Sequence, residues 1–385
     1  MKILILPIIT FLSMWTLVTI SLKLSVTEVT YDLDLTYFIV FITSFVVFIF
    51  GIFLASIFPR LKQNSIIYSS VEISINSLKN TNNQKVLIKT FYYVFGSVLL
   101  LVILNLLSFG LPPFFGFLGF NTIPYLEYGR FLGFLIPLAG VMIVLSPFFI
   151  KKKYKYFSFL FGITILVLYV NRGPLMFYLF QLLLVKLIVD YYLAKRKTSY
   201  FLKKSFIILG FTLFMIYLMA LIGEYRSGLS SFKIFLRITD DAFDYYNIGI
   251  LWFLTYFSIP ASNFFHYFNL LNFNEIQSVS FFSNILPAFL KIDSSVYIPI
   301  KRLNTTIDGV HFYMYNWYAE LGLLGLISVN LLYGFMVYFF RKNILLYVIS
   351  ISVLFFAFFI DYLIYFPTIV ELSVFLYISY KIRRN

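Results

Sequence analysis

The chain has 385 residues, 61% of them hydrophobic and 12% charged, with a mean hydropathy of +0.91 and a formal net charge of +14. Soluble domains carry about 25% charged residues, so this composition indicates an integral membrane protein. The chain has no cysteine and two histidines, which excludes disulfides, thiolate catalysis and a multi-histidine metal site.

Apolar runs long enough to cross a bilayer recur along the whole chain, since a crossing helix needs about 20 residues. They predict an all-α polytopic membrane protein with about 10 transmembrane helices (10–12), in which residues 1–385 form a single membrane domain. The first run follows Lys2 and lacks a small-residue cleavage site, so we expect a retained span. The ten runs are Ile3–Leu22, Tyr37–Phe58, Phe91–Phe109, Phe131–Ile150, Phe157–Val170, Pro174–Leu193, Ser205–Gly223, Trp317–Phe340, Leu345–Ile360 and Leu363–Tyr380.

The basic residues predict the orientation, because cytoplasmic segments are enriched in Lys and Arg. With both termini in the cytoplasm, 20 of the 30 Lys and Arg residues lie inside, nine lie outside and Lys186 falls within a span. Clusters of this kind between apolar runs argue against nucleic acid as a partner. This orientation predicts that residues 61–89 form a cytoplasmic linker. We expect its amphipathic middle, Ile66–Ser77, to lie at the membrane surface.

The same topology makes residues 224–315 one large external loop. It contains an apolar stretch, Ile248–Phe268, that Pro260 interrupts. A single crossing there would invert the basic pattern that follows, so we expect a re-entrant or interfacial helical element. His266, beside Phe265 and Tyr267, is typical of an interfacial aromatic belt.

Basic side chains on the predicted outer face are candidates for binding a diphosphate, because guanidinium groups bind phosphate oxygens in bidentate fashion. Arg172 lies in NRGP between two closely spaced spans, and Arg226 lies in GEYRSG beside Glu224 and Tyr225. Further basic candidates follow at Arg237 and Arg302. Each also suits a plainer role, as a helix anchor or a partner of lipid phosphate, and Glu224 suits an ion pair with Arg226.

A second group of candidates lies where the external loop enters the next span, in TTIDGVHFYMYNWYAELGLLGL from Thr305 to Leu326. His311 can accept a proton from a hydroxyl near neutral pH, or simply bond to backbone. Asp308 and Glu320 can orient such a base, or pair with Arg across the bundle. We expect Glu320 about two turns inside its span, with small residues after it that let a neighbouring helix approach, namely Gly322 and Gly325.

These segments resemble motifs of the O-antigen ligase and polymerase superfamily. HFYMYNWYAELGLLGL resembles the H-N-x-(x)₆-E-x-G-x-x-G element that closes the large periplasmic loop: His311, Glu320, Gly322 and Gly325 match in spacing, whereas Phe312 replaces the usual Asn. NRGPL resembles the Arg-Gly element of Wzy-type O-antigen polymerases, and EYRSG resembles their Arg-bearing loop. The resemblance covers about residues 157–343; the first half matches in hydropathy alone.

The resemblance implies a metal-independent glycosyltransferase of the GT-C kind, without cofactor, in the bacterial cytoplasmic (inner) membrane with its active site facing outward. Such enzymes polymerise undecaprenyl-diphosphate-linked oligosaccharide repeat units into O-antigen, capsule or exopolysaccharide. Besides this substrate and membrane lipid, a chain-length regulator protein is a candidate partner. The implied catalytic residues are His311, Arg172, Arg226 and Glu320, and the implied substrate- or diphosphate-binding residues are Arg237, Arg302, Tyr225, Glu224 and Asp308.

Three other functions stay open at this stage. An O-antigen ligase would attach finished chains to their acceptor. A flippase or transporter for lipid-linked oligosaccharide would carry basic groups inside its spans, where this sequence places only Lys186. A membrane scaffold would use the external loop as a binding surface.

Overall fold

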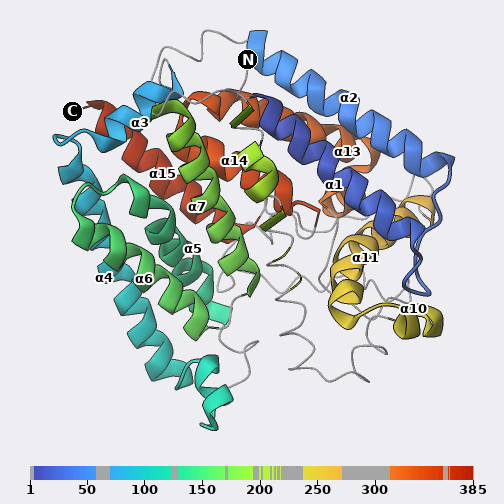
Figure 1. Ribbon diagram of the computed structural model, residues 1–385, viewed down its shortest axis with the longest axis horizontal. Helices are drawn as coiled ribbons and strands as arrows, with labels where there is room; N and C mark the ends of the chain where they lie inside the picture. Colours follow the sequence, from blue (N-terminus) through green and yellow to red (C-terminus); the bar gives the residue numbers. More distant parts are fainter. Residues whose placement is uncertain are drawn as a thin grey trace.

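The computed structural model describes residues 4–57, 70–122, 129–169, 172–193, 237–270, 313–358 and 365–384, together with residue 363 and short helical pieces between 199 and 217 (Figure 1). The described chain is helical almost throughout. Its α-helices are α1 (Ile5–Lys23), α2 (Leu35–Ile57), α3 (Val71–Lys79), α4 (Gln84–Phe109), α5 (Gly129–Leu145), α6 (Lys152–Leu168), α7 (Arg172–Leu193), α10 (Asp240–Tyr245), α11 (Ile248–Leu270), α13 (Met314–Phe339), α14 (Ile344–Phe356) and α15 (Phe366–Arg384). Short 3-10 turns occur at η3 (Pro113–Leu118), η5 (Ser146–Phe148) and η8 (Phe340–Lys342).

Seven of the described helices are long and apolar enough to cross a membrane, and they comprise most or all of α1, α2, α4, α5, α7, α11 and α13. Two further helices, α6 and α14, occupy predicted spans but have 17 and 13 residues. The last predicted span is α15, which ends in three basic residues. The predicted span Ser205–Gly223 lies largely outside the described residues. The protein is therefore an all-α, multi-pass membrane protein.

The predicted inner segments gather at one end of the bundle. Both chain ends and α3 lie there, opposite α10 and α11 (Figure 1). Buried polar side chains join the helix ends at this level: the Gln84 amide donates to the Phe148 carbonyl at 3.0 Å and accepts from Ile150 N–H at 3.1 Å, and Ile344 N–H donates to Ser74 Oγ at 3.2 Å. These hydrogen bonds bring together the predicted inner segments before α4, after α5 and before α14.

Helix α3 has the amphipathic character expected of the linker around Ile66–Ser77. Ser70 caps its first turn by accepting a hydrogen bond from Ile73 N–H at 3.2 Å. Val71, Ile75 and Leu78 are buried against the bundle, whereas Glu72 is exposed. The spacing of four and three residues between the buried side chains places them on one helical face.

The closest helix pairing is between α2 and α13, and two glycines make it close. A Cβ at Gly51 would overlap the carbonyl oxygen of Leu331, and a Cβ at Gly334 would overlap that of Phe48. Each glycine thus admits the backbone of the other helix, as small residues do where membrane helices pack closely.

Helix α11 continues through Pro260, so the expectation that Pro260 interrupts this stretch is wrong. Its 22-residue apolar part, Ile248–Asn269, has the length and hydropathy of a span. The re-entrant or interfacial placement of 248–268 stays a prediction. The helix packs against α1, and its N-terminal half forms a small core with Val26 and Ile238.

Candidate functional site

Six of the nine predicted site residues lie outside the described residues: Glu224, Tyr225, Arg226, Arg302, Asp308 and His311. For Arg172 and Glu320 the structure describes the backbone, and for Arg237 it also describes the side chain. Their chemical roles therefore stay predictions. The structure does determine where the helices that carry these motifs begin.

The first turns of α7 and the residue before α13 both contact the C-terminal end of α14. Arg172 is the first residue of α7, and Phe177, five positions later, packs its ring against Phe356 with a centroid distance of 5.4 Å. On the other side, Tyr313 N–H donates to the Ala357 carbonyl at 3.1 Å. The helix that begins at Arg172 and the segment that follows His311 thus contact neighbouring residues of α14, although about 140 positions separate them in the sequence.

The start of α13 folds back on the rest of the helix. Tyr313 O–H donates to Asn330 Oδ1 at 2.7 Å, and the Tyr313 and Tyr333 rings are 5.4 Å apart. In a straight helix, residues 17 positions apart would be separated by about 25 Å. The reversal occurs at Gly322, whose φ of 58° and ψ of −140° lie in a region that is open almost only to glycine.

This reversal corrects two expectations from the sequence. Gly325 does allow a close approach, but the approaching group is the Trp317 carbonyl of the same chain segment, and no described atom lies within 4 Å of a Cβ at Gly322. Glu320 was expected two turns inside the span. It instead precedes the bend, because the apolar spanning part begins at Leu321.

Arg237 has a carboxylate partner. Its guanidinium lies 3.1 Å from Glu28 in the loop between α1 and α2, and both side chains are partly exposed. Backbone pairing supports this contact: Glu28 N–H donates to the Arg237 carbonyl at 2.9 Å, beside an antiparallel bridge between Thr27 and Ile238. Arg237 adopts a φ of 48° at this point. The contact suits the plainer role of an anchor, and the assignment of Arg237 to a diphosphate stays a prediction.

A polar network that the sequence analysis missed joins the α1–α2 loop to α11. Tyr31 O–H donates to Asp34 at 2.6 Å and accepts from the Asn269 amide at 2.7 Å, while Tyr31 N–H donates to Ser262 Oγ at 3.0 Å. Burial and the hydrogen bond to Asp34 raise the pKa of Tyr31 to about 12. His266 Nε2 lies 3.0 Å from the Val29 carbonyl, so it bonds to backbone.

One signal for this network was present in the sequence. Ser262, His266 and Asn269 are spaced by four and three residues in a mostly apolar helix, so they share one face. Polar groups that share a face of a membrane helix need partners there. The partners could not be identified, because they lie more than 200 positions away in the α1–α2 loop.

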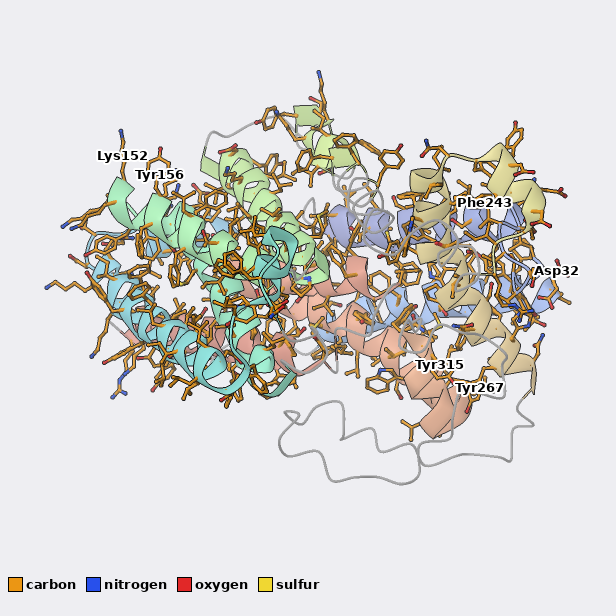
Figure 2. All side chains as sticks on the ribbon, turned by 90° about the horizontal axis from the view of Figure 1, so that it is seen from below. Asp32, Lys152, Tyr156, Phe243, Tyr267 and Tyr315 are labelled. Carbon is orange, nitrogen blue, oxygen red and sulfur yellow. The ribbon has the colours of Figure 1, made fainter. Side chains whose placement is uncertain are left out.

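Aromatic rings connect the C-terminal half of α11 to the start of α13. Figure 2 shows Tyr267 and Tyr315 next to each other, with ring centroids 4.8 Å apart. Tyr318 packs against Phe268 at 4.7 Å and against Phe264 at 6.0 Å. These contacts hold the folded-back start of α13 against α11. Through Tyr31 and Ser262, they also connect it to the α1–α2 loop.

In the part of the chain that the structure describes, no group of three His, Asp or Glu side chains is placed to hold a metal ion. Comparison of the chain with protein-family models, with curated proteins and with solved structures gave no match. The fold and the site together define the class, a multi-pass, all-helical membrane protein in which two motif-bearing helices begin at one end of α14. A more specific function depends on this chain's own residues.

Proposed function

We propose that this protein polymerises undecaprenyl-diphosphate-linked oligosaccharide repeat units into a surface polysaccharide on the outer face of a bacterial cytoplasmic membrane. In this proposal it has a GT-C-like arrangement with about ten spans and both termini in the cytoplasm. The observation that carries the proposal is the convergence at the end of α14. There the NRGP helix packs through Phe177 on Phe356, and the segment after His311 is bonded through Tyr313 to Ala357.

The chemistry of glycosyl transfer from a diphosphate explains why these residue types would be needed together. The bond between the anomeric carbon and the diphosphate oxygen breaks, and the acceptor hydroxyl oxygen forms the new glycosidic bond. The departing diphosphate carries its negative charge away, so it needs neutralisation more than protonation, and Arg side chains supply this without a metal. We assign this role to Arg172, Arg226 and Arg302.

The acceptor hydroxyl must be positioned and must lose its proton during the transfer. We assign the base to His311, whose unperturbed pKa allows it to accept a proton near neutral pH. Glu320 or Asp308 would orient the imidazole, and Tyr225 would contact the sugar. The bend at Gly322 supports this assignment, because Glu320 precedes the apolar spanning part of α13 and is close in sequence to His311.

The first experiment is the glycan profile of a deletion strain, separated by size and probed on both the lipid carrier and the surface acceptor. A polymerase predicts single repeat units on the acceptor and no ladder of longer chains. Long chains retained on the carrier would instead identify a ligase. Absence of lipid-linked units from the outer face would identify a flippase. An unchanged profile would refute all three.

Point variants then test the site. Arg172→Ala and Arg226→Ala should leave the protein level unchanged and abolish long chains. Lys186→Ala is the matched control, because Lys186 is an exposed cation on the same helix as Arg172 but 14 positions further along α7. Normal ladders from both arginine variants would refute the site assignment.

A further inference from the structure

The most unusual ionisable group among the described residues is Glu371, on α15. Its side chain is fully buried. Gln181 on α7, which is also fully buried, donates from Nε2 to Glu371 Oε2 at 3.2 Å. An ionised carboxylate at such a position is costly unless it is paired and fully hydrogen-bonded.

The remaining oxygens of this pair have no partner among the described residues. Glu371 Oε1 and Gln181 Oε1 are both buried without a hydrogen bond, and so is the hydroxyl of Thr368, one turn before Glu371 on α15. The amide oxygen of Gln181 is an acceptor, and an ionised carboxylate offers only acceptors. With an ionised Glu371, the pair thus contains three acceptor oxygens, and two of them, Glu371 Oε1 and Gln181 Oε1, have no donor among the described residues.

No described cation offers the missing charge. The only hydrogen bond to the Glu371 carboxyl from a described side chain comes from Gln181. Lys186, five positions after Gln181, is exposed rather than buried, and the basic residues of α15 begin ten positions later at Lys381. Glu371 therefore forms no ion pair within the described residues.

We propose that Glu371 and Gln181 form a proton-binding site inside the helix bundle, in which Glu371 Oε1 carries the proton and donates it to Gln181 Oε1. A proton at this position converts one of the two unpaired acceptors into a donor. Together with the observed Nε2–Oε2 bond, it closes a cyclic acid–amide pair in which both side chains are satisfied.

The site would lock α7 to α15. Both helices pack against α5. The two hydrogen bonds of the acid–amide pair would fix the rotation of α7 relative to α15. The hydroxyl of Thr368 lies one turn before Glu371 on the same helix and is also buried without a described partner. This inference is independent of glycosyl transfer and stands if that function fails.

Infrared difference spectroscopy of the purified protein in lipid nanodiscs tests the proton directly. A protonated carboxyl has a carbonyl stretch that is distinct from that of a carboxylate and shifts in deuterated water. At neutral pH this band should be present in the wild type and absent in Glu371→Gln. It should persist in Glu72→Gln, the matched control, because Glu72 is exposed on α3. A band unaffected by Glu371→Gln would overturn the proposal.

Stability measurements distinguish the proton from a bound cation. Glu371→Gln preserves a neutral, hydrogen-bonding side chain, so it should unfold near the wild-type temperature, whereas Glu371→Leu should unfold earlier because it leaves the Gln181 amide unsatisfied. If the oxygens instead bind a monovalent cation, sodium chloride should raise the unfolding temperature of the wild type relative to choline chloride, and Glu371→Gln should abolish the difference. That result would also overturn the proposal.

Discussion

The α2–α13 pairing gives the sharpest prediction about stability, because it depends on the absence of two side chains. We expect Gly334→Ala to force the helices apart. A Cβ at this position would overlap the Phe48 carbonyl oxygen and lie 3.0 Å from its carbonyl carbon. Carbon atoms pack best at about 3.5–4.0 Å. The carbonyl carbon must therefore retreat by roughly 0.5–1 Å, and its oxygen by more.

Such overpacking costs about 1–3 kcal/mol in a well-packed interior. Because the overlapped atoms belong to the backbone of α2, no side-chain rotation can relieve the contact. We expect a cost toward the upper part of that range. Gly51→Ala should behave similarly, since its Cβ would overlap the Leu331 carbonyl oxygen. Both changes impose the same separation on the helices, so the double variant should cost less than the sum of the two.

The assay is unfolding of the purified protein in nanodiscs, followed by intrinsic fluorescence. Gly96→Ala is the matched control: it is an exposed position in α4, and none of the described residues has an atom within 4 Å of a Cβ there. This control should be neutral or stabilising by about 0.4–1 kcal/mol, because alanine restricts the unfolded chain more than glycine does. If Gly334→Ala unfolds at the same midpoint as Gly96→Ala, the close approach of α2 and α13 is not present in the membrane.

Three further predictions concern the bend at Gly322 and the α1–α2 loop. Gly322→Ala should lower the free energy of unfolding by about 1–3 kcal/mol in the same assay, because its φ of 58° disfavours a side chain. An unfolding midpoint equal to that of Gly96→Ala would contradict the bend. Glu28→Gln should lower the free energy of unfolding by less than about 1 kcal/mol, because the ion pair of Glu28 with Arg237 is partly exposed. A larger loss would show that the ion pair is coupled to the surrounding loop. Burial and the hydrogen bond to Asp34 raise the pKa of Tyr31 to about 12. The neutral hydroxyl therefore makes its full contribution to stability below a pH of about 10, the pKa of an unperturbed tyrosine. This contribution is lost as the pH rises toward 12. Tyr31→Phe should therefore flatten the decline of the unfolding temperature above that pH, and an unchanged decline would exclude Tyr31 as its source.

The sequence by itself determined the class of protein and the positions of most helices. Hydropathy is a sum over neighbouring residues, so a run such as Tyr37–Phe58 predicts its helix without any knowledge of what packs beside it. The observed helix α2 spans Leu35–Ile57. The motif residues could also be named from the sequence, since their chemistry belongs to the residue types.

Only the tertiary structure decided which faces meet. The contacts of Tyr31 with Ser262 and of Gln181 with Glu371 join residues 231 and 190 positions apart, and no local pattern encodes such a pair. Gly322 matched a motif, but its function in the bend became visible only when Tyr313 was found bonded to Asn330. Lipid and protein neighbours are both apolar, so hydropathy cannot distinguish a lipid-facing residue from a buried one. The specific contacts of a membrane bundle depend instead on steric fit and on the few polar groups that must find each other.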